Sequence, residues 1–93
     1  MVSYKTVSDG SMGMQDVEIK QRIEKDIVKF YVNFQKAKGL KMGKKIVELS
    51  EMYARDSKSY LDKGDYYTSF SCISYAHGLL DAILELSGIE HVQ

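Results

Sequence analysis

His77 and Asp81 are the two side chains in this 93-residue chain whose types and spacing could support acid–base chemistry. Residues four apart are neighbours on a helix, so the carboxylate could orient the imidazole as a general base. Arg55 and Asp56 would complete a candidate polar cluster if the fold brought them to the same place. Because the sequence supplies no nucleophile or substrate-polarising group beside the pair, we favour a histidine at the edge of the core, hydrogen-bonded to its helical neighbour.

The chain lacks the motifs of a metal or redox site. It has two histidines and one cysteine, Cys72, and contains neither a CxxC pair nor an HExxH sequence, so we expect no metal and no cofactor. Cys72 has no histidine close in sequence to activate it, which favours a packing residue over a nucleophile. A lone cysteine forms no internal disulfide, as is typical of a cytoplasmic protein.

No apolar run approaches the roughly 18 residues that span a membrane, and the start of the chain does not resemble a signal peptide. We therefore expect a cytoplasmic protein without membrane association.

A basic segment surrounds the turn between the first two predicted helices. It has no acidic side chain and consists of Lys36, Lys38, Lys41, Lys44 and Lys45. Such a turn could contact the phosphates of a nucleic acid, which we keep as an alternative function. However, the 13 basic and 13 acidic residues of the chain cancel, and no aromatic side chain stands between the lysines to stack on bases. We favour a solvated turn that complements the helix dipoles.

Apolar spacing predicts three helices. In the first, from residue 16 to about residue 38, steps of three and four connect Ile19, Ile23, Ile27, Phe30, Phe34 and Ala37. The second, from about residue 43 to 63, has one stripe of Ile46, Leu49, Tyr53, Ser57 and Tyr60, widened by Val47, Ala54 and Leu61.

The sequence KGD at residues 63–65 predicts a hinge, because Gly64 suits the end of one helix and Asp65 the cap of the next. A third helix follows from residue 66 to about 87, and we expect the segment after it to fray.

The third helix is apolar over more than one face, so we predict that it is the central element. A strip of small residues on it would let another backbone approach closely. Together with flanking apolar side chains, this strip forms a candidate interface: Phe70, Ser71, Ser74, Tyr75, Gly78, Leu79, Ala82 and Leu86. A broad apolar surface on a small domain usually has a partner, so we expect a homodimer or a complex with another protein.

Together these elements predict an all-α fold, namely a three-helix antiparallel up-down-up bundle. The bundle would occupy residues 16–93 as one domain, preceded by a flexible N-terminal arm over residues 1–15. The absence of proline agrees with long, unbroken helices.

Several short runs resemble a known family. They are YARD at residues 53–56, YL at 60–61, KGD at 63–65, Phe70 and ISYAHGLLDA at 73–82. This pattern is similar to an archaeal helical domain-of-unknown-function family, number 357 in its series. The resemblance implies a short helical bundle from an archaeal cytoplasm with no assigned activity, substrate or cofactor, so no catalytic residue carries over.

The function is therefore unknown from sequence. Our first hypothesis is a non-enzymatic helical module for protein–protein interaction or assembly. Nucleic-acid binding through the segment from Lys36 to Lys45 is the alternative, and an enzyme using His77 and Asp81 is the third hypothesis.

Overall fold

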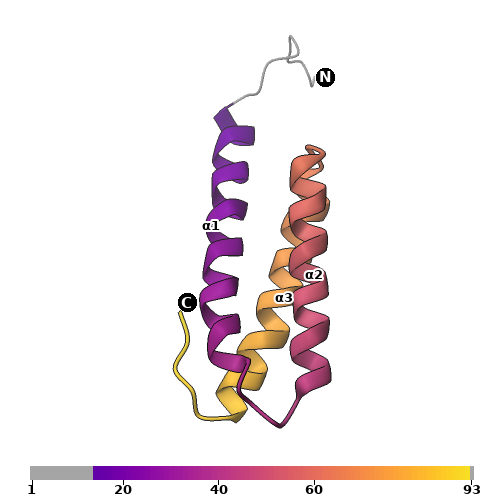
Figure 1. The fold of residues 1–93 in the computed structure, drawn as a ribbon. Coiled ribbons are helices and arrows are strands. Elements are labelled where there is room, and N and C mark those ends of the chain that lie inside the picture. Colours follow the sequence, from indigo (N-terminus) through magenta and orange to yellow (C-terminus); the bar gives the residue numbers. More distant parts are fainter. Residues whose placement is uncertain (1–13, 93) are drawn as a thin grey trace.

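The computed structural model describes residues 14–92, which form three helices and, within that range, no strand (Figure 1). The helices are α1 (Met14–Ala37), α2 (Lys44–Asp62) and α3 (Tyr66–Leu86). The predicted all-α class is confirmed, and each helix end lies within two residues of its predicted position. Residues 1–13 of the predicted arm lie outside the described residues, whereas Met14 and Gln15, which we assigned to the arm, begin α1.

Long-range contacts define the directions of the helices. Tyr53 packs against Tyr75, with ring centroids 4.6 Å apart, at the middle of α2 and α3. Gly43 lies against Ile83 at their other end, so α2 and α3 run in opposite directions. Arg22 lies over Phe70, and further along α1 the ring of Phe30 meets His77, so α1 and α3 run in the same direction (Figure 1).

The core lies where α3 meets both other helices, in agreement with its predicted central place. Phe30 and Ile23 of α1 are fully buried, whereas the predicted core residue Ile19 is exposed beside Tyr67 and Phe70 at the open end of the bundle. The remaining fully buried apolar side chains come from α2 and α3: Ala54, Ile73, Ala76, Leu80 and Leu84.

The buried stripe of α2 differs from the predicted one. Ile46, Leu49 and Tyr60 were expected in the core and are exposed. The buried residues are Val47, Ser50, Ala54, Ser57 and Leu61, and all of them except Ser50 belong to the predicted stripe or to the residues that widen it. Small side chains fill this seam, and their hydroxyls find partners inside it, so burying them leaves no unpaired polar group. Hydrophobic spacing alone therefore centred the buried face too far toward Ile46, Leu49 and Tyr60, and it missed Ser50.

The hinge between α2 and α3 has the predicted form. Gly64 adopts a left-handed φ of 81°, which costs a side-chain-free residue little. The Asp65 carboxylate accepts a hydrogen bond of 3.1 Å from the backbone N–H of Thr68 and so caps α3.

Candidate functional site

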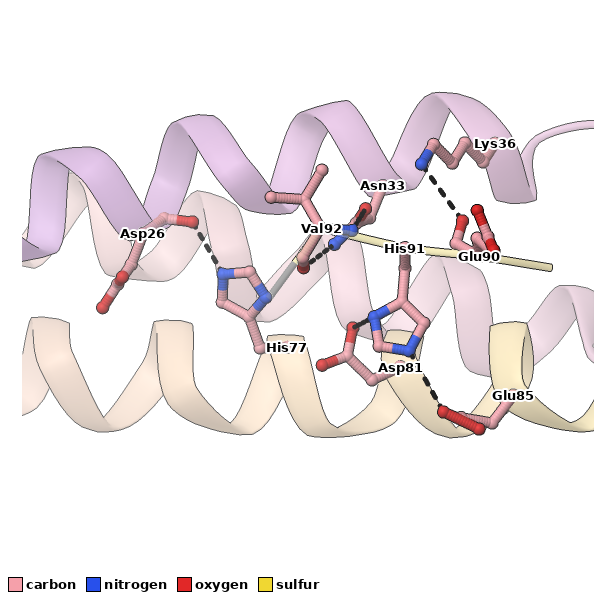
Figure 2. A network of polar contacts seen from close by, with 9 residues as sticks. All are labelled: Asp26, Asn33, Lys36, His77, Asp81, Glu85, Glu90, His91 and Val92. Atoms are coloured by element: carbon pink, nitrogen blue, oxygen red, sulfur yellow. Dashed lines mark hydrogen bonds and ion pairs between the residues drawn. The ribbon is translucent and has the colours of Figure 1, made fainter.

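His77 does not pair with Asp81. Its Nε2 lies 2.7 Å from the backbone carbonyl oxygen of Asp26 on α1 (Figure 2). Since a carbonyl oxygen only accepts, Nε2 carries the proton and donates it to this bond. The ring also meets Phe30 edge to face at 5.8 Å. The predicted bond to a helical neighbour is thus wrong: His77 is a half-buried link between α3 and α1.

Asp81 instead faces His91, which follows α3 in the chain. The His91 Nδ1 is 3.5 Å from Asp81 Oδ1, and its Nε2 is 3.4 Å from Glu85 Oε1 (Figure 2). The His91 side chain is only 7% exposed. Sequence reasoning missed this group because it treated His91 as part of a fraying end.

That end does not fray. The tail (residues 88–92) turns back at Gly88, whose φ is 70°, and runs along α1 (Figure 1). The backbone N–H of Ile89 donates to the carbonyl of Leu84 at 2.9 Å, a bond typical of a helix closed by a left-handed glycine. The prediction of fraying is therefore wrong. The residues that hold the tail in place lie on α1.

Asn33 of α1 binds the tail with both ends of its amide. Its Nδ2 donates to the Val92 carbonyl at 2.9 Å, and its Oδ1 accepts from the Val92 N–H at 2.7 Å (Figure 2). Lys36 Nζ donates to the Glu90 carbonyl at 3.0 Å. One sequence signal could have shown this, since Asn33 lies between Phe30 and Ala37 on the core face of α1 and a buried amide needs partners.

The candidate polar cluster is not assembled. A hollow of about 430 Å³ lies beside His77 and Asp81, and its other lining residues are Arg22, Asp26, Lys29, Ser74 and Val92. Arg55 instead pairs with Glu51 at 3.6 Å. Asp56 acts on Cys72, whose pKa is raised first by burial and then by the charges of Asp56 and Asp65. The arginine and aspartate of α2 thus do not take part in the histidine site.

The outer face of α3 is open to solvent. Tyr67 is 84% exposed and Leu86 is 76% exposed. A Cβ added to Gly78 would meet nothing within 4 Å, so the close approach predicted for it does not occur within the chain. We define the outer face by the uncharged exposed residues of α3, which are Tyr67, Phe70, Ser71, Ser74, Tyr75, Gly78, Ala82 and Leu86. Glu85, on the same helix, is also exposed. Leu79, also in the predicted interface, is half-buried.

The lysines of the basic segment are all exposed around the turn between α1 and α2. Lys36 is occupied with the Glu90 carbonyl. Lys44 and Lys45 lie in the first turn of α2, which follows Gly43 and has no side-chain cap. This turn therefore combines backbone N–H groups that no side chain caps with two lysines and no acidic residue.

Among residues 14–92, no group of three or more His, Cys, Asp or Glu side chains is placed to hold a metal ion. No helix of the same range is long and apolar enough to cross a bilayer.

These features define a small all-α domain, a three-helix bundle whose following segment is bound back onto its first helix. The family described as "Protein of unknown function (DUF357)" matches residues 21–89. The chain belongs to this DUF357 family, as the resemblance indicated. Comparison with curated proteins and with solved structures found no match.

Proposed function

We propose that this protein is a non-enzymatic assembly module that pairs with a second copy of itself through the outer face of α3. It would act in the cytoplasm, where its single cysteine remains reduced. The carrying observation is the absence of Asp, Glu, Lys and Arg from Tyr66 through Leu80, although one side of this stretch faces solvent. Interface centres are depleted in charge and enriched in tyrosine.

The order of side-chain sizes along the face supports a second copy as the partner. Consider two α3 helices crossing antiparallel about a two-fold axis between Ala76 and His77. Tyr67 then lies opposite the partner's Leu86, and Ser71 opposite the partner's Ala82. The ring of Tyr75 lies on the partner's Gly78, where the structure leaves room for it. Large groups thus meet at the ends, small ones meet between them, and at the centre a large ring is set against a glycine, so the face is complementary to itself.

The Tyr75 ring is well placed for this role. It is half exposed, yet its packing against Tyr53 holds it in position before a partner arrives. Ordering a side chain in advance lowers the entropy that association must overcome.

The test is the solution mass by light scattering over a range of concentrations. The wild-type chain of 10.6 kDa should reach twice that mass. Ser71→Glu places a carboxylate in the proposed interface and should weaken pairing by roughly a hundredfold. Ser59→Glu adds the same charge at an exposed serine of α2 and should leave the mass unchanged. A monomer at all concentrations, or equal behaviour of the two variants, would overturn the proposal.

A second candidate function is nucleic-acid binding at the basic segment, favoured by the uncapped, lysine-bearing start of α2. Changing Lys41, Lys44 and Lys45 to alanine should abolish DNA binding that weakens steeply between about 50 and 200 mM salt. The same change at Lys20, Lys25 and Lys58, which are also exposed, is the matched control. Absence of binding at low salt would eliminate this candidate.

A further inference from the structure

The buried imidazole of His91 lies between the carboxylates of Asp81 and Glu85, and a ring with one N–H can donate a hydrogen bond to only one of them. Its Nδ1 and Asp81 Oδ1 are both buried without a hydrogen-bond partner, although they lie only 3.5 Å apart. On the other side of the ring, Nε2 faces Glu85 Oε1 at 3.4 Å (Figure 2). Neutral imidazole has one N–H, so one of its nitrogens must present a lone pair to a carboxylate oxygen. Imidazolium has two N–H groups and can donate to both.

Charged groups of α3, α1 and the tail surround the ring. From α3 it faces the two carboxylates of Asp81 and Glu85. From α1, the Lys36 ammonium donates to the carbonyl of Glu90, the residue before His91, and Lys29 lines the hollow that Asp81 also lines. The tail itself adds the carboxylate of Glu90, whose side chain is exposed. The groups that the two ring nitrogens of His91 face directly are both carboxylates.

We infer that the tail is a pH-sensitive strap, bound firmly to α1 and α3 when His91 is protonated and more loosely when it is neutral. The Asn33 and Lys36 bonds to the tail backbone do not involve the His91 ring, so they hold the tail in register in both states. His91 sets how strongly the strap is closed. Between about pH 5 and 8, histidine changes charge while carboxylates stay ionised.

Opening of the strap would change a specific surface. Val92 lines the hollow together with His77 and Ser74, and Ser74 belongs to the outer face of α3. Lifting the tail would also leave the fully buried Asn33 amide without its two bonds to Val92. Release therefore exposes the α1–α3 seam next to the outer face, and this holds whether or not that face pairs with a second copy.

Hydrogen exchange of the Val92 amide in the full chain, followed by NMR, tests the strap directly. After correction for the intrinsic pH dependence of exchange, protection should be roughly tenfold greater at pH about 5.5 than at pH about 8. His91→Gln keeps one donor and one acceptor but does not titrate, so its corrected protection should be equal at the two pH values. Asn33→Ala should remove the protection at both.

Either of two results of the pH comparison, or the absence of any protection, would overturn the inference. One is equal corrected protection of Val92 at the two pH values in the wild-type chain. The other is an unchanged pH dependence in His91→Gln, which would assign the effect to a different group such as His77. An exchange rate of Val92 in the wild type that matches an unstructured amide at both pH values would also contradict a docked tail.

Discussion

Ser57 of α2 and Ser69 of α3 exchange hydroxyl-to-backbone hydrogen bonds across a fully buried seam. Ser57 Oγ donates to the Ser69 carbonyl at 2.7 Å, Ser69 Oγ donates to the Ser57 carbonyl at 2.7 Å, and the two oxygens are 3.0 Å apart. This reciprocal pair joins the two helices at a point where neither carries a large apolar side chain, and it accounts for the burial of a serine stripe on α2.

Removal of one hydroxyl should lower stability by a modest amount. Ser57→Ala loses one donor and leaves a small void, which should cost about 1–2 kcal/mol in the free energy of unfolding. Urea unfolding of Ser57→Ala, Ser69→Ala and the double variant would also give a coupling energy between the two. Ser59→Ala, at an exposed position, should change the free energy by less than about 0.5 kcal/mol. Equal effects at residues 57 and 59 would refute a structural role for the pair.

Gly43 should tolerate substitution less well than Gly64. Both have a left-handed φ, 74° and 81°, which disfavours any residue with a Cβ. A Cβ on Gly43 would also lie 2.6 Å from Cδ1 of the buried Ile83, whereas one on Gly64 meets nothing within 4 Å. We expect about 1 kcal/mol of destabilisation for Gly64→Ala and about 1–3 kcal/mol more for Gly43→Ala in thermal or urea unfolding. Identical losses would show that Ile83 moves aside at no cost.

Gly78→Ala separates the stability of the single chain from its association. A Cβ there has no neighbour in the chain, and alanine is a better residue than glycine inside a helix by about 1 kcal/mol. At dilutions where the chain is a monomer, the variant should be more stable. At higher concentration it should pair less well, because the proposed interface places a tyrosine ring on this glycine. Unchanged pairing together with the gain in stability would place Gly78 outside any interface.

The thiol of Cys72 should react slowly. Burial raises its pKa, and the negative charges of Asp56 and Asp65 raise it further, so little thiolate exists near neutral pH. Iodoacetamide at pH about 7.5 should modify the folded chain several-fold more slowly than the chain unfolded in urea. Asp56→Asn should raise the folded rate slightly. A rate equal to that of the unfolded chain would show that the thiol is neither shielded nor perturbed.

The raised pKa of Cys72 also predicts that the folded protein loses stability at alkaline pH. The Cys72 thiol has a higher pKa in the folded than in the unfolded chain, so unfolding releases its proton as pH rises above the usual thiol value of about 8.5. The pKa of Tyr31 is likewise raised, first by burial and then by Glu51, and it extends the effect toward pH 10 and above. The free energy of unfolding should therefore fall between about pH 8.5 and 11. Cys72→Ser should reduce the lower part of this decline.

The three helices and the capped hinge could be predicted from sequence because their causes are local. Apolar residues three and four apart define a helix wherever it packs, and Asp65 caps α3 through the N–H of Thr68 only three residues away. The uncharged stretch from Tyr66 to Leu80, on which the proposed interface rests, is likewise visible in the sequence, and one side of it is exposed in the structure.

Only the tertiary structure decided which polar side chains meet. Asn33 binds Val92, 59 residues away, and His77 binds the Asp26 carbonyl, 51 residues away. Hydrophobic periodicity describes the face of a helix and not the register between two helices, so it could not place these partners. Which edge of α2 is buried likewise depends on a contact between helices, the hydrogen bonding of Ser57 with Ser69 of α3. The sequence by itself determined the elements and their caps, whereas long-range hydrogen bonds in the packed chain determined the buried edge of α2 and the course of the tail.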